Sequence, residues 1–240
     1  MTDLTQLFAA AEQAWRRELP AQWDARFAAA AACADGRIAA ASEAGCAASL
    51  AACLQALRTA VPDCRPGDVL ITNDVYSGAT HPTELTAATP LAHGGGVSGW
   101  AMARIELADL GGWDLGGYSP RALDIWSEAA RIVPAIVFRG GKPRREVLDM
   151  LQLNSRTPRL NLACVGSLSH ALLGMAAIDA FTEVFRGSRI EVIHTSHVLL
   201  RENWRGRNLL LPMSGGSHER RLRESLGIAA VALHSALCLA

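Results

Sequence analysis

Residues 67–84, GDVLITNDVYSGATHPTE, decide the fold of this chain. Their apolar beginning predicts a short buried strand, and the polar residues after it predict a loop whose backbone is freed by Gly78. The loop brings Asp74, His81 and Glu84 within a few residues of one another. Carboxylates and an imidazole in this arrangement are typical of hard metal ligands or of acid–base groups.

The segments upstream predict one helix and then a contested region. Apolar residues recur at helical spacing over residues 4–15, and Pro20 ends the pattern. Residues 27–33, FAAAAAC, have a high intrinsic helix preference, whereas the Asp35-Gly36 pair that follows is a hairpin-turn signal. From these residues alone, both a helix and a two-stranded hairpin remain open.

The rest of the chain alternates strand and helix patterns. Short apolar runs predict strands at residues 68–72, 85–91, 97–107 and 133–138, with a turn at residues 94–96. Helical spacing predicts helices over residues 43–61, 146–153, 160–185, 190–204 and 219–239. We therefore expect an α+β fold with a mixed or antiparallel sheet, packed helices and a helical C-terminal extension.

The expected domain organisation is a first domain over residues 1–160 and an extension over residues 161–240. The last helix of the extension is apolar over its whole circumference and would be costly to leave in water. We expect it to pack on the core, on a partner or on a second copy of the chain.

The composition excludes several classes of function. The 240 residues include 23 basic and 23 acidic ones, without a long run of either sign, so we expect neither nucleic-acid nor membrane binding. The six cysteines show no C-x-x-C pairing, which favours reduced thiols. Because the N-terminus lacks the pattern of a signal peptide and no apolar run is long enough to span a bilayer, we expect a cytoplasmic protein.

Five blocks of the chain carry a family resemblance, at residues 34–38, 72–84, 103–112, 125–134 and 154–158. They read ADGRI, TNDVYSGATHPTE, ARIELADLGG, IWSEAARIVP and NSRTP. In this order they resemble the A-D-G-R-L, T-N-D-P-Y-x-G-G-T-H-L-P-D, N-R-A-H-H-x-D-I-G-G, I-F-Q-E-G-L-R-I-P-P and N-x-R-T-P blocks of the hydantoinase B/oxoprolinase family. The chain resembles only an N-terminal half of that family's B-type subunit.

The resemblance implies a fold and a class of function. It favours two strands rather than a helix around Asp35-Gly36. Family members are B-type subunits of ATP-dependent hydantoinases, oxoprolinases and ketone carboxylases. An A-type partner uses ATP to phosphorylate an amide or enolate oxygen, and the B-type subunit completes the reaction with a bound metal. ATP would therefore reach this chain only through a partner subunit.

The resemblance also implies a metal site, which this sequence matches in part. The family's metal lies between an early Asp, the His and Asp of T-H-L-P-D, and a His of N-R-A-H-H. His81 keeps its identity, Glu84 replaces the Asp, and Glu106 stands at the first His. Leu107 replaces the second His, and Arg26 stands where the early Asp belongs unless a two-residue shift supplies Asp24 instead.

The resulting site prediction has metal ligands and catalytic groups. The expected metal ligands are His81, Glu84, Glu106 and Asp74, and the cation is Mn²⁺, Fe²⁺, Mg²⁺ or Zn²⁺, with hard cations favoured by the carboxylates. Glu84, Glu106 and Asp109 are the expected catalytic residues. The alternative interpretation is structural: His81 caps the loop, and the acidic residues are solvated charges at strand ends.

Three functional hypotheses follow. The chain is an enzyme subunit that acts on cyclic amides or carbonyl substrates beside an A-type partner; it is a catalytically degenerate, shortened scaffold; or it is one half of a split B subunit whose C-terminal half is a separate polypeptide. The first predicts bound metal, whereas the second predicts docking without chemistry.

Overall fold

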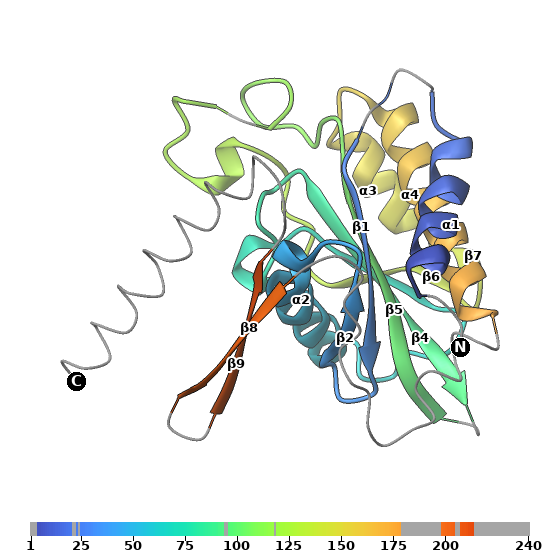
Figure 1. The fold of residues 1–240 in the computed structure, drawn as a ribbon. Helices are drawn as coiled ribbons and strands as arrows, with labels where there is room; N and C mark the ends of the chain where they lie inside the picture. The colour runs from blue at the N-terminus through green and yellow to red at the C-terminus, as the bar shows by residue number, and fades with distance from the viewer. Residues whose placement is uncertain are drawn as a thin grey trace. The chain divides into compact units, whose positions relative to one another are not determined.

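The computed structural model describes residues 4–20, 23, 25–93, 96–117, 119–178, 198–204 and 207–213, the last two ranges by their backbone (Figure 1). The chain divides into two units, residues 1–193 and residues 194–240. The first unit holds every residue of the expected site.

A seven-stranded antiparallel sheet forms the centre of the first unit, in the order β2-β1-β5-β4-β3-β6-β7. Its strands are β1 Phe27–Cys33, β2 Ile38–Ala41, β3 Val69–Thr72, β4 Glu84–His93, β5 Gly96–Glu106, β6 Ala135–Arg139 and β7 Lys142–Pro143. The longest pairing is that of β4 with β5, whose last pair is His93 opposite Gly96, beside the glycines where the sequence predicts a turn. The α+β fold with an antiparallel sheet is therefore confirmed.

Helices cover both faces of this sheet (Figure 1). They are α1 Leu4–Arg17, α2 Ala47–Ala60, α3 Arg145–Leu153 and α4 Pro158–Ala176, with single 3₁₀ turns η1 Ala44–Cys46, η2 Val75–Ser77 and η3 Ile125–Ser127. The larger core lies between the sheet and the helices α1, α3 and α4, whereas α2 closes a smaller core on the opposite face. Alternate residues of β1, β3, β4 and β5 supply the two cores, as the two-residue period of a strand requires.

The alanine-rich segment forms the hairpin, not a helix. Strand β1 pairs with both β2 and β5, so its backbone groups are bonded on both edges. Ala29 and Ala31 face the larger core, whereas Ala30 and Ala32 face the α2 side. Small side chains on both faces let helices approach the strand closely, and burial between two cores outweighs the helix preference of alanine.

The expected helix over residues 190–204 is wrong in the part that the structure describes. β8 Val198–Trp204 pairs antiparallel with β9 Arg207–Met213 in a hairpin of the second unit. Apolar spacing within one segment does not reveal a hydrogen-bonding partner strand, and that partner decides between helix and strand here. The expected helix over residues 219–239 lies outside the described residues, and where the second domain begins stays a prediction.

Candidate functional site

The loop between β3 and β4 is held by the side chain of Asn73. Its Oδ1 accepts from the N–H of Ile132 over 2.5 Å, while Nδ2 donates to the carbonyls of Pro82 and Ala130 over 2.5 and 2.9 Å. Thr72 Oγ1 also donates to the Ile132 carbonyl over 2.9 Å. Two of the blocks that carry the family resemblance are thereby tied together.

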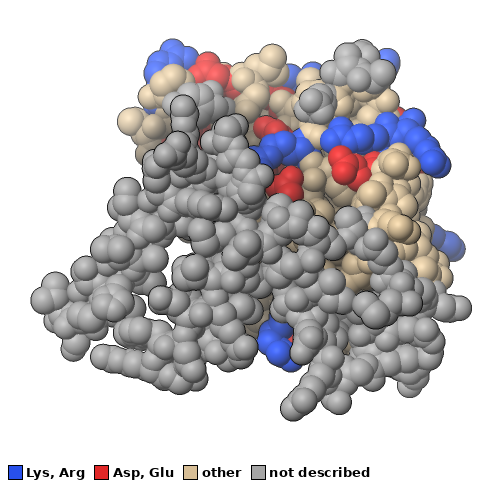
Figure 2. Space-filling model, in the orientation of Figure 1, with Lys and Arg blue, Asp and Glu red and all other residues tan. Residues whose placement is uncertain are grey.

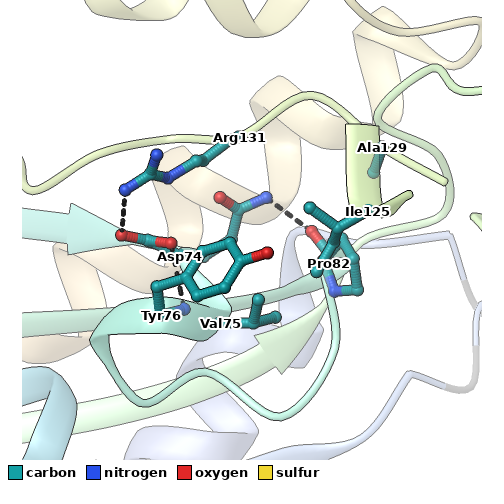
Figure 3. A pocket seen from close by; sticks show the side chains of 8 residues that line it. Asp74, Val75, Tyr76, Pro82, Ile125, Ala129 and Arg131 are labelled. Carbon is teal, nitrogen blue, oxygen red and sulfur yellow. Dashed lines mark hydrogen bonds and ion pairs between the residues drawn. The ribbon is translucent and has the colours of Figure 1, made fainter. Parts of the chain in front are cut away.

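Asp74 is buried and already has partners for its carboxylate. Oδ1 accepts from the Tyr76 N–H over 3.1 Å, and Oδ2 accepts from Ser77 Oγ and from Arg131 Nη2, both over 2.7 Å (Figure 3). Burial by itself raises the pKa of Asp74, but the hydrogen bonds from Arg131, Ser77 and Tyr76 outweigh it and hold the pKa below its usual value. Asp74 therefore caps η2 and anchors Arg131.

Asp109 is engaged in the same way at the same end of the sheet, where β5 ends beside the start of β4. It is fully buried, and its Oδ1 accepts from Nε and Nη2 of Arg156 over 3.0 and 2.5 Å. Its Oδ2 accepts from the N–H groups of Arg156 and Gly111 over 2.7 and 3.3 Å. Burial raises its pKa, and the bonds from Arg156 outweigh burial so that the pKa is lowered. The carboxylate of Asp109 thus holds the N-S-R-T-P block, residues 154–158, against the segment that follows β5.

Glu84 lies buried beside a buried arginine. Its carboxylate accepts from Thr80 Oγ1 and is 3.5 Å from Nη1 of Arg104, whose side chain is 4% exposed. Arg104 also donates to Thr86 Oγ1 over 3.0 Å and to Ser49 Oγ over 2.7 Å. His81 approaches from the solvent side, with Nδ1 3.4 Å from Glu84 Oε1 and a side chain 62% exposed. The structure thus brings together His81 and Glu84, two of the four expected ligands.

The remaining positions are more dispersed. Glu106 stands directly opposite Glu84 in the β4–β5 register, but it is exposed. Leu107 points into the larger core, which explains why an apolar residue is accepted there. Arg26 is largely exposed, and its Nη2 lies 3.6 Å from Oε2 of Glu43. This ion pair includes neither His81 nor Glu84. Asp24 lies outside the described residues.

These residues are a poor fit to the metal centre that the resemblance implies. Asp74 and Asp109 each bind a guanidinium, and the fixed charge of Arg104 competes with any cation for the carboxylate of Glu84. Among the residues that the structure describes, no group of three or more His, Cys, Asp or Glu side chains is placed to hold a metal ion. The expected ligand set stays a prediction, and we derive no chemical step through a metal.

Three arginines that sequence reasoning passed over carry most of these contacts: Arg104, Arg131 and Arg156. Each stands inside one of the resemblance blocks, which was the available signal. A guanidinium does not ligate a cation, so a pattern of acidic residues and histidines in the sequence does not indicate the arginines that neutralise them.

A shallow pocket lies next to the Asp74–Arg131 pair (Figure 3). Its cavity volume is about 10 Å³, room for about one water molecule and far below the roughly 300–1,000 Å³ of typical small-molecule sites. Its lining residues come from the β3–β4 loop and from the segment around η3: Asn73, Asp74, Val75, Tyr76, Pro82, Ile125, Ala129 and Arg131. This hollow is too small to hold a substrate.

The Gly140-Gly141 turn offers no phosphate loop. The Gly140 N–H donates to Asp68 Oδ1 over 2.8 Å, and the Gly141 N–H donates to the Gly67 carbonyl over 2.7 Å. Backbone donors that already have internal acceptors are not free to bind a phosphate.

Other sequence expectations concern thiols and membranes. Cysteines 33, 46, 53, 64 and 164 are free thiols, as expected, and Cys238 lies outside the described residues. Burial raises the pKa of Cys46 and of Cys164 to about 11. No helix within the described ranges combines the length and apolar character needed to cross a membrane.

Comparisons with known proteins place the chain in a family. The model of the hydantoinase B/oxoprolinase family matches residues 22–178. Similar proteins include the caprolactamase subunit beta of Pseudomonas jessenii, 31% identical over 38% of this chain and 16% of that protein. A 5-oxoprolinase of Pestalotiopsis fici is 32% identical over 32% of this chain and 6% of that protein. The chain thus matches only a small part of these relatives' length.

Two solved structures share the fold. The ATP-dependent caprolactamase of Pseudomonas jessenii superposes with a TM-score of 0.60 at 20% identity, over 78% of this chain and 35% of that chain. A nucleotide-free acetone carboxylase superposes with a TM-score of 0.60 at 18% identity, over 74% of this chain and 26% of that chain. With the family model matched over residues 22–178 of 240, this chain belongs to the hydantoinase B/oxoprolinase family.

Proposed function

We propose that this chain is a B-type component of an ATP-dependent complex of the hydantoinase/oxoprolinase kind, and that it serves there as a folded scaffold without supplying a metal centre. Relatives named caprolactamase, 5-oxoprolinase and acetone carboxylase support the class of complex. Its substrate would be a cyclic amide or a carbonyl compound. ATP would be bound by an A-type partner subunit.

The scaffold role is supported by the contacts that residues of the family blocks make in the folded chain. The blocks are retained where they brace the fold, through the pairs Asp74–Arg131 and Asp109–Arg156. At the implied ligand positions the chain instead has Arg26 and Leu107, and Glu84 lies 3.5 Å from Arg104. A chain that keeps its bracing residues and loses its ligands can still fold and dock.

The test is capture of the tagged full-length chain from its own cells, followed by mass spectrometry and reconstitution. We expect an ATP-binding A-type subunit to co-purify. ATP hydrolysis by the reconstituted complex, driven by cyclic amide, should depend on this chain and be unchanged by the double substitution His81→Ala and Glu106→Ala. Capture of neither an ATP-binding protein nor a polypeptide resembling the rest of a B subunit contradicts the proposal. A separate C-terminal half in the capture favours the split-subunit form of it.

A second candidate is the enzyme subunit with a divalent metal on His81, Glu84 and Glu106. It is favoured by the 3.4 Å approach of His81 to Glu84 and by the position of Glu106 opposite Glu84 on the neighbouring strand. Equilibrium dialysis against Mn²⁺, Fe²⁺, Mg²⁺ or Zn²⁺ followed by elemental analysis separates the two candidates. One metal per chain that is lost in the His81→Ala, Glu106→Ala variant supports the enzyme. Equal metal content in both proteins supports the scaffold.

A further inference from the structure

We draw no further inference here: the strongest candidate, the exposed apolar side chains Tyr76, Leu123 and Trp126 around η2 and η3, carries none, because nothing in the structure shows what covers them, and the basic and acidic side chains on the described part of the face in Figure 2 are interspersed, with no field of one sign that would select a charged partner.

Discussion

Arg156 donates from both Nε and Nη2 to the same Oδ1 of Asp109, over 3.0 and 2.5 Å, across 47 positions of the chain. The second oxygen of Asp109 receives the backbone N–H groups of Arg156 and Gly111. One buried carboxylate therefore fixes the end of the strand region and the start of α4 relative to each other. A residue expected to take part in chemistry is fully used in holding the fold.

Substitution Asp109→Ala should destabilise the chain by about 1–3 kcal/mol, because buried N–H donors lose their acceptor. The measurement is equilibrium unfolding in urea, with the slope compared between variants. Asp63→Ala is the control, since Asp63 is 69% exposed and its pair with Arg139 is long at 3.5 Å. The control should change stability by less than about 0.5 kcal/mol. Equal effects of the two substitutions contradict the structural role of Asp109.

Stability should fall in acid because of Asp74 and Asp109. Both have pKa values below the usual value in the folded chain, since burial is outweighed by bonds from Arg131 and Arg156. The pKa of an aspartate in the unfolded chain is about 4, and at pH values between this and the lower folded pKa the unfolded chain binds more protons. The contribution of Asp74 and Asp109 to the free energy of unfolding is therefore fully present above about pH 4 and is lost as the pH falls through the folded pKa values. Urea midpoints from pH 7 to pH 3 should fall less steeply for Asp74→Asn than for the wild type. Parallel curves contradict the assignment.

The hairpins of the fold could be predicted from the sequence, whereas the contacts of the candidate site could not. The hairpins are predictable because turn residues such as Asp35-Gly36 act locally. The engagement of Asp74 by Arg131, 57 positions away, is not, because only tertiary packing brings the two groups together. Likewise β8 lacks a local signal that separates it from a helix, since its partner β9 provides the deciding hydrogen bonds.

Two glycines of the loop after β5 should respond very differently to alanine. Gly112 and Gly116 both have positive φ, at 82° and 88°. A Cβ at Gly112 would lie 2.1 Å from the Glu128 carbonyl oxygen, whereas one at Gly116 meets nothing within 4 Å. Gly116→Ala should cost about 1–2 kcal/mol for the left-handed backbone alone. Gly112→Ala should cost at least about 2 kcal/mol more, from overpacking against backbone that cannot move aside. Urea unfolding of both variants checks the order, and equal costs contradict it.

The coupling between Arg104 and Glu84 can be measured by a double-mutant cycle. Arg104→Met keeps most of the buried volume but leaves the carboxylate of Glu84 without its guanidinium, and it should destabilise the chain by about 3–5 kcal/mol. Adding Glu84→Gln removes the unpaired charge, so the double variant should recover at least about 1 kcal/mol relative to Arg104→Met alone. Arg37→Met is the control, because Arg37 is 81% exposed, and its urea midpoint should equal that of the wild type. If the effects of Arg104→Met and Glu84→Gln simply add, the two groups are not coupled, and the argument that Arg104 competes with a metal ion for Glu84 fails with them.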